Sequence, residues 1–148
     1  MITAIGVTVL LFAACSALHF GFLKGASVLS RPAAAPGRAL GTALSLVALA
    51  HTVEALIYAG GFWVAARWLG VGHLESLGAD GPSTLAFMDY YYFSLVNFTT
   101  LGRGDLAPQG HLRFMTGLEA FQGFLLITAS GSYILQVMTG RDPFGAQR

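Results

Sequence analysis

Three long apolar segments dominate this sequence, at about residues 2–23, 40–69 and 111–138. Each is at least as long as the roughly 20 residues that a helix needs to cross a bilayer. Of the 148 residues, 55% are hydrophobic and only 10% are charged, which is too few charges to cover a soluble domain of this size. The formal net charge of +1 gives no indication of nucleic-acid binding. The sequence therefore predicts an all-α membrane protein with three transmembrane helices.

A fourth apolar segment, at about residues 84–98, is too short to cross a bilayer as a helix. It leads directly into the run Thr99-Thr100-Leu101-Gly102-Arg103-Gly104-Asp105. Irregular backbone at membrane depth is tolerated only where protein shields it or where it faces a water-filled cavity. The pattern therefore predicts a re-entrant helix followed by a loop that lines a cavity.

The glycines of this run permit an unusual backbone geometry. Gly102 and Gly104 can adopt positive φ without a Cβ clash, so that successive carbonyls can point the same way. Thr100 can add a ring of hydroxyl groups below those carbonyls. An isolated Gly-x-Gly would be weak support, but the whole run stands in a membrane context.

The run resembles the potassium-channel signature, in which Thr-Thr-x-Gly-aromatic-Gly-Asp forms the selectivity filter, except that Arg103 replaces the aromatic residue. More narrowly, the chain resembles small bacterial three-helix ion-channel proteins, through the step from His51 to Glu54 and through residues 92–96 and 118–120. The resemblance implies that backbone carbonyls replace the hydration shell of a permeant ion. The residues so implied are Thr100, Leu101, Gly102, Arg103 and Gly104.

The same resemblance divides the chain into three parts. Residues 1–39 would form an N-terminal transmembrane helix with a basic cytoplasmic connector, and residues 40–138 a pore module of outer helix, pore helix, filter and inner helix. Residues 139–148 would form a short cytoplasmic tail that leaves no room for a regulatory domain. One loop cannot enclose a conduction path, so we expect a closed ring, a homotetramer by analogy.

Arg103 would place a guanidinium behind the filter, where a buried charge needs an acid or hydrogen bonds. Its candidate partners are Asp89, Asp105, Glu119 and Glu54. The aromatic residues before the filter are expected either to brace it or to be ordinary interfacial aromatics. The residues expected to support the filter are Asp105, Asp89, Tyr91, Tyr92, Phe93, Glu119, His51 and Glu54.

Ionisable residues within the apolar segments are costly and normally face the interior of a bundle. His51, Glu54 and Tyr58 share one helical face, and Glu119 lies in the last segment. Three interpretations stay open for them: hydrogen-bonded anchors of the filter, a pH-sensitive gate using His51, and a metal site. His19 is a lone histidine on an apolar helix, and we expect it to be a packing residue with satisfied hydrogen bonds.

Polar and small residues of the last segment have two interpretations each. Gly123 is a possible hinge by the resemblance, although glycines in membrane helices also allow close packing. Gln122, Thr128 and Ser130 are candidates to face a central cavity, and helical phase alone does not choose among them.

The basic residues predict the orientation in the membrane. Lys24, Arg31 and Arg38 lie in the first connector, and Arg141 and Arg148 lie in the tail. Three spans place both regions on one side, which the positive-inside rule makes cytoplasmic. We therefore expect a multi-pass protein of the cell (inner) membrane, with the N-terminus and the re-entrant loop outside.

These features predict a passive channel for monovalent cations, with potassium the first candidate ion and sodium the second. No enzymatic step, cofactor or other metal is expected. The alternatives are a weakly selective cation pore, because Arg103 alters the filter, and a non-conducting scaffold or partner subunit. A third alternative is an intramembrane metalloenzyme built on His51, Glu54 and Glu119.

Overall fold

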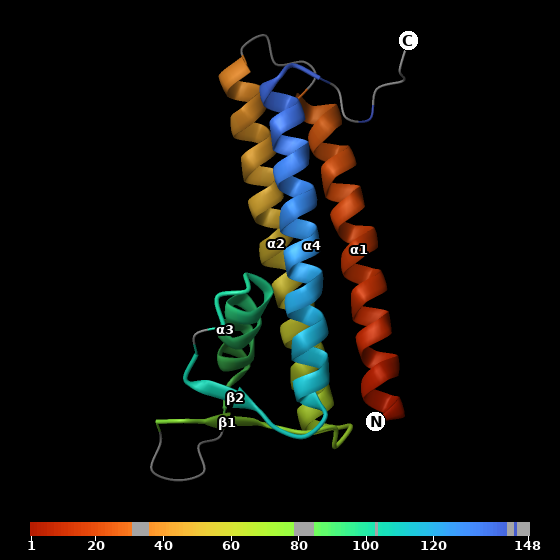
Figure 1. Cartoon of the computed structure of the whole chain (residues 1–148), viewed down its shortest axis with the longest axis vertical. Helices are drawn as coiled ribbons and strands as arrows, with labels where there is room; N and C mark the ends of the chain where they lie inside the picture. The colour runs from red at the N-terminus through yellow and green to blue at the C-terminus, as the bar shows by residue number, and fades with distance from the viewer. Residues whose placement is uncertain (31–35, 79–84, 103, 142–143, 145–148) are drawn as a thin grey trace.

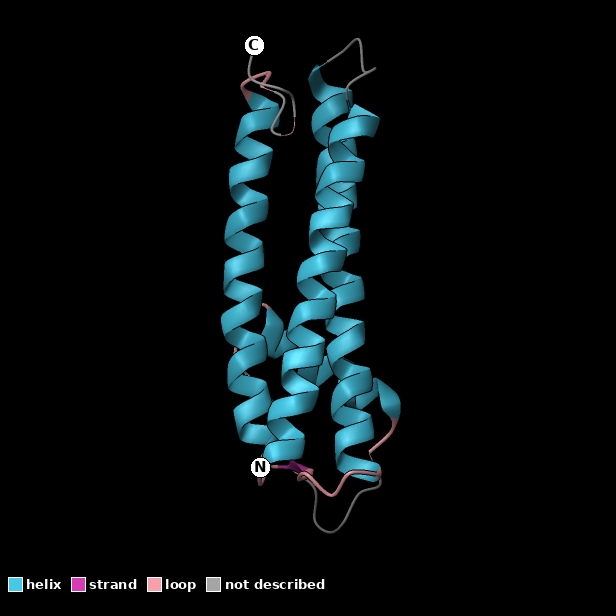
Figure 2. Ribbon diagram, turned by 90° about the vertical axis from the view of Figure 1, so that its right-hand side faces the viewer, coloured by secondary structure: helices cyan, strands magenta, loops and turns pink. Residues whose placement is uncertain are grey.

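Three long helices run side by side for most of the molecule (Figures 1 and 2). They are α1 (Ile2–Ser30), α2 (Pro36–Arg67) and α4 (Leu112–Met138) in a computed structural model that describes residues 1–30, 36–78, 85–102, 104–141 and 144. All three are long and apolar enough to cross a membrane. The predicted number and order of transmembrane helices agree with this architecture.

The end of α1 and the start of α2 lie at other residues than the sequence predicted. α1 continues to Ser30, so Lys24 lies within its last two turns. A helix of 29 residues is about 44 Å long, which exceeds the apolar core of a bilayer and leaves those turns for the headgroup region. α2 begins at Pro36, because proline has a favourable φ at the first helical position. The expected boundary between residues 39 and 40 therefore falls inside α2.

The short helix α3 (Phe87–Phe98) packs against α2 and α4 in the half of the bundle that holds the N-terminus (Figure 1). Its first turn is capped by the Asp89 carboxylate, whose Oδ2 accepts a hydrogen bond from the backbone N–H of Ala86 at 2.7 Å. At 12 residues it is about 18 Å long, too short to span. This agrees with the predicted re-entrant helix.

A two-stranded antiparallel sheet was not expected from the sequence. β1 (Leu74–Ser76) pairs with β2 (Leu106–Pro108), with Leu74 opposite Pro108. The all-α prediction is therefore wrong for these six residues, since strands of three residues carry no periodic signal. The sheet ties the segment after α2 to the segment that leads into α4.

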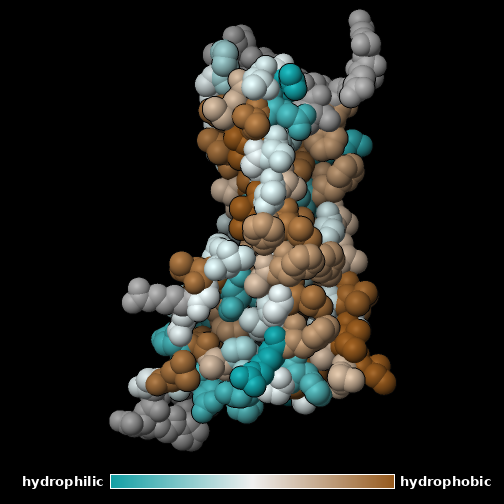
Figure 3. Space-filling view, in the orientation of Figure 1, coloured by the Kyte–Doolittle hydropathy of each residue, from teal (hydrophilic) through white to brown (hydrophobic). Residues whose placement is uncertain are grey.

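The bundle is held together by close helix contacts and is apolar outside. Fully buried positions on α2 include Ala55, Ala59 and Phe62. Small side chains let helix backbones approach closely, which is how packing holds membrane helices together. Figure 3 shows apolar residues over the long helices and hydrophilic ones gathered around the strands. Such a surface suits contact with lipid or with neighbouring chains.

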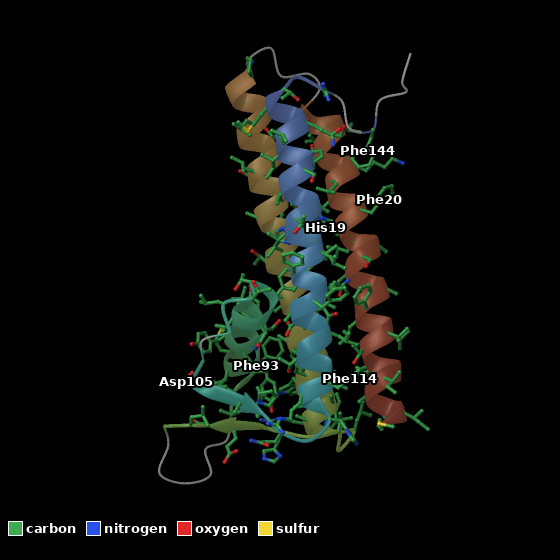
Figure 4. All side chains as sticks on the ribbon, viewed as in Figure 1. His19, Phe20, Phe93, Asp105, Phe114 and Phe144 are labelled. Carbon is green, nitrogen blue, oxygen red and sulfur yellow. The ribbon has the colours of Figure 1, made fainter. Side chains whose placement is uncertain are left out.

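The two ends of the bundle contain different segments of the chain. The N-terminus, α3 and both strands lie at one end, and the ends of α1 and α4 lie at the other (Figure 1). From the tail, the Phe144 ring returns to α1 and meets the Phe20 ring edge-on at 5.7 Å (Figure 4). The end of α1, the start of α2 and the end of α4 therefore lie at the same end of the bundle.

Candidate functional site

The end of α3 reaches deep into the bundle. A Cβ atom on Gly123 of α4 would lie 1.9 Å from the carbonyl oxygen of Phe98, the last residue of α3. Gly123 is eleven residues beyond Leu112, which places this contact about 16 Å along α4. The chain then returns from this depth through residues 99–105 to β2. This is the geometry of a re-entrant loop.

The loop is shaped by hydrogen bonds to the last turn of α3. The carbonyl of Val96 accepts hydrogen bonds from the N–H groups of Leu101 at 3.1 Å and of Gly102 at 3.2 Å. Gly102 has φ +63°, as expected, and Thr100 has φ +58°, which was not expected of a β-branched residue. Gly104 follows Arg103, and Arg103 lies outside the described residues.

The carbonyls of this loop are available to a ligand. Among the described residues, no hydrogen-bond donor reaches the carbonyl oxygens of Thr100, Leu101 or Gly102. All three residues are exposed, and Leu101 is 69% exposed although it follows a helix that lies at membrane depth. The loop therefore presents unsatisfied backbone oxygen atoms on an open face of the single chain.

A cavity of about 260 Å³ lies behind the loop. Gly102 and Gly104 line it from the loop, Tyr92 and Val96 from α3, and Thr116 from α4.

The three aromatic residues expected to form one brace are placed differently. Phe93 is buried and packs edge-on against Phe62 of α2, with ring centroids 5.4 Å apart. The Tyr91 hydroxyl is 3.4 Å from the carbonyl of Thr52 on α2. Tyr92 is 44% exposed and lines the cavity behind the loop. Phe93 and Tyr91 thus attach α3 to α2, and Tyr92 and Phe93 both line the cavity next to the loop.

Arg67 holds the start of α3 in place. Its guanidinium donates a hydrogen bond to the carbonyl of Leu85 at 3.0 Å and lies 5.5 Å from the centre of the Trp63 ring. Burial raises the pKa of the nearby Tyr90 phenol, and the positive charge of Arg67 opposes that rise. This anchor could not be predicted from the sequence, because the partner of Arg67 is a backbone carbonyl.

Three of the four acids considered as partners of Arg103 have other hydrogen-bond partners. Asp89 caps α3, and the fully buried Glu119 accepts a hydrogen bond from Ser94 of α3. Glu54 bonds to two histidines. Asp105 is exposed, and its carbonyl accepts the N–H of Leu77 at 2.7 Å.

His51 and Glu54 lie together, but Glu119 does not join them. His51 Nδ1 is 2.9 Å from Glu54 Oε2, and His19 Nδ1 of α1 is 2.9 Å from Glu54 Oε1. His19 is buried and hydrogen-bonded, as expected of a satisfied packing residue, but its partner is the same carboxylate that His51 contacts, which the sequence did not indicate. Ser130 of α4 completes the group, with its Oγ 3.3 Å from His19 Nε2 and 3.2 Å from His51 Nε2. Figure 4 shows His19 about midway along the bundle.

Two of the three candidate cavity-facing residues of α4 point into the bundle instead. Gln122 is fully buried, accepts a hydrogen bond from the Tyr58 hydroxyl and donates one to the carbonyl of Phe12 on α1 at 2.8 Å. Ser130 is buried in the histidine group, whereas Thr128 is exposed. Gly123 serves close packing against α3, and its role as a hinge stays a prediction.

This architecture is typical of one class of membrane protein. A multi-pass membrane protein that inserts a short helix and an exposed carbonyl loop between two spans has the pore-domain plan of an ion channel. The chain belongs to the ion channel family, whose family model matches residues 51–140, from the middle of α2 through α3 and the loop to the end of α4. The predicted family resemblance is confirmed, and the chain is a channel-family protein rather than an enzyme.

One curated relative is similar to part of this chain. The chain is 33% identical over 84 residues to the uncharacterized membrane protein YdjJ of Bacillus subtilis (strain 168). The match covers 52% of this chain and 25% of the relative, so the chain spans about a quarter of that protein's length. No solved structure matches the chain.

Proposed function

We propose that this chain forms a passive channel for monovalent cations, with potassium as the preferred ion and sodium as the second candidate. One observation carries the proposal: α3 ends midway along α4 and delivers a loop in which the carbonyls of Thr100, Leu101 and Gly102 have no donor among the described residues. Membership in the ion channel family supports it. Carbonyl oxygens are the ligands that replace the hydration shell of potassium in channel filters.

The filter in this proposal consists of residues 100–104. Their carbonyls coordinate the ion, and the Thr100 hydroxyl adds a further oxygen. The C-terminal end of α3 points toward membrane depth at Phe98, where its partial negative charge favours a cation. Asp105 follows at the outer mouth and attracts cations there.

The working unit in this proposal is a ring, with four chains by analogy to channels that carry this signature. The loop is exposed on one chain, so several copies are needed to enclose a path. Exposed apolar residues of α4 such as Phe121, Phe124 and Leu125 supply faces for neighbours or lipid. We place the loop and N-terminus outside the cell and the connector and tail in the cytoplasm.

We propose that Arg103 contributes its backbone to the filter and pairs through its side chain with Asp105. Asp89, Glu119 and Glu54 are occupied by the contacts described above, which leaves Asp105 from the original four candidates. In this proposal the Arg103 side chain is directed away from the ring axis, and the cavity lined by its sequence neighbours Gly102 and Gly104 is the candidate space for it.

Ion flux from liposomes tests this function. The purified chain is reconstituted, and thallium or potassium flux is compared with sodium flux under matched gradients. We expect flux that favours potassium over sodium and that scales with the amount of protein. Equal flux of both ions would favour the weakly selective pore. No flux from a correctly assembled ring would favour the non-conducting scaffold.

A further inference from the structure

The histidine group gathers metal-binding side chains from separate helices. His19 of α1 and His51 and Glu54 of α2 each offer one ligand atom, and these atoms lie within 4.8 Å of one another. In the part of the chain that the structure describes, this is the one group of three such residues. Glu54 is fully buried and His19 is 3% exposed, while His51 is partly exposed.

With both imidazoles neutral, the side chains of this group supply one hydrogen fewer than their hydrogen bonds need. If both Nδ1 atoms donate to the Glu54 carboxylate, both Nε2 atoms become acceptors. Both Nε2 atoms face the Ser130 hydroxyl, at 3.3 and 3.2 Å, and that hydroxyl has one hydrogen to give. With both imidazoles neutral, one ring nitrogen, of the buried His19 or of the partly exposed His51, is then left without a donor.

The shortage is removed either by a proton on one imidazole, which would pair with the Glu54 carboxylate, or by a metal ion on the Nδ1 side. With the metal ion bound, both histidines carry their hydrogen on Nε2, and the Ser130 oxygen can accept from both. This is the usual arrangement of metal-binding histidines, which donate their second ring N–H to a nearby acceptor. Tetrahedral zinc with bond lengths of 2.0–2.1 Å needs ligand atoms about 3.4 Å apart. The two Nδ1-to-carboxylate distances are 2.9 Å, whereas the ligand atoms of the group lie up to 4.8 Å apart. To hold the ion, the carboxylate contacts must lengthen by about 0.5 Å and the more distant ligand atoms must move closer together.

We propose that His19, His51 and Glu54 bind a divalent transition-metal ion of the zinc class, with Ser130 as the hydrogen-bond partner that orients both imidazoles. Imidazole nitrogen favours zinc, copper, iron and nickel over magnesium or calcium. Three protein ligands leave one coordination position for water.

The proposed ion would join α1 to the pore-forming helices. His19 is the ligand from α1, outside the region matched by the ion channel family, and the other two ligands lie inside it. The His51 ring is also 5.7 Å from the Phe98 ring at the end of α3. The metal site therefore lies directly beneath the loop, but it does not depend on the loop conducting ions.

Zinc binding to the purified chain tests the proposal without any flux measurement. The full chain in detergent is stripped with a chelator, titrated with Zn²⁺ and analysed by calorimetry and by elemental analysis after desalting. We expect one zinc per chain and a rise in melting temperature with added zinc. Co²⁺ should replace it and give the visible absorption of a tetrahedral site with nitrogen and oxygen ligands.

Four variants locate the bound ion. Zinc binding should be lost in His19→Ala and in Glu54→Gln, and Ser130→Ala, which keeps all three ligands, should weaken it by about 10–100-fold. The matched control is His73→Ala, because His73 is an exposed histidine outside the group. Circular dichroism confirms that each variant is folded.

Two results would overturn the proposal. One is a wild-type chain that retains no more zinc than Glu54→Gln. The other is zinc binding that survives His19→Ala and Ser130→Ala but disappears in His73→Ala. If His19→Ala does not fold, the Ser130→Ala affinity and the Co²⁺ spectrum still decide the question.

Discussion

The carbonyl oxygen of Phe98 lies so close to Gly123 that a Cβ atom at residue 123 would come within 1.9 Å of it. The nearest atom belongs to backbone at the end of α3 and cannot rotate away as a side chain could. The last turn of α3, and with it the start of the loop, is therefore positioned by the missing side chain of one residue on α4.

Gly123→Ala should consequently destabilise the protein. Overpacking against rigid backbone typically costs about 1–3 kcal/mol, and the clash would also displace the loop. Gly117→Ala is the matched control on the same helix, because a Cβ there meets nothing within 4 Å. Thermal melting in detergent should show a lower midpoint for Gly123→Ala and an unchanged or higher one for Gly117→Ala. Equal midpoints would contradict the close contact.

The buried acid on α4 gives a second prediction. Glu119 is fully buried and lies within hydrogen-bond distance of the Ser94 hydroxyl, whose one hydrogen is shared between the Glu119 carboxyl and the carbonyl of Ala55. Glu119→Ala should cost about 2–4 kcal/mol in unfolding free energy, through the cavity and the lost hydrogen bond. Glu75→Ala, at an exposed acid that contacts Gln109, should change stability by about 0.5 kcal/mol or less. Similar losses for both variants would show that Glu119 is not buried in the membrane.

The long helices could be predicted because hydropathy and length are local properties of the sequence. Their ends could not, since Lys24 near the end of α1 can extend its amine toward the headgroups while the helix continues. The strand pair could not be predicted either, because Leu74 and Pro108 are far apart in sequence and each strand has three residues.

The loop could be predicted from the sequence and the histidine group could not, again because the first is a local feature and the second joins distant residues. The loop was recognisable because its residues are consecutive and their types are specific to one kind of backbone geometry. His19 and Glu54 are 35 residues apart on different helices, and their meeting depends on how α1 rotates against α2. That rotation is set by packing throughout the bundle, so no single motif encodes it. For the same reason, the sequence does not choose among the four candidate acids that could pair with Arg103.

Gly102 provides a prediction on function. Its φ of +63° lies in the left-handed region, which costs an L-residue with a side chain about 1–2 kcal/mol. Gly102→Ala should therefore reduce potassium flux from liposomes about tenfold or more, since 1.4 kcal/mol is a factor of ten in an equilibrium constant. Gly78→Ala is the control, because a Cβ there meets nothing and no positive φ is required. Undiminished flux from Gly102→Ala would argue against residues 100–104 as the filter.

Arg103 provides the most discriminating prediction. Four arginines on a ring axis would repel cations and one another: two unit charges about 8 Å apart at an effective dielectric constant of about 20 cost about 2 kcal/mol per pair. A side chain directed off the axis and paired with Asp105 avoids that cost and leaves the carbonyls free for ions. Arg103→Tyr, which restores the aromatic residue of the signature, should keep or increase the preference for potassium over sodium.

The proposed pair with Asp105 predicts how a second variant behaves. Asp105→Asn should lower potassium flux in the wild-type background, because it leaves the guanidinium without its counter-charge and removes an acid from the pore mouth. In the Arg103→Tyr background the same change should have a smaller effect, since only the mouth charge is lost. A double-mutant cycle of potassium-to-sodium flux ratios measures this coupling. Additive effects would exclude the pair, whereas anion flux through the wild-type chain would mean that Arg103 faces the pore and that the cation-channel function is wrong.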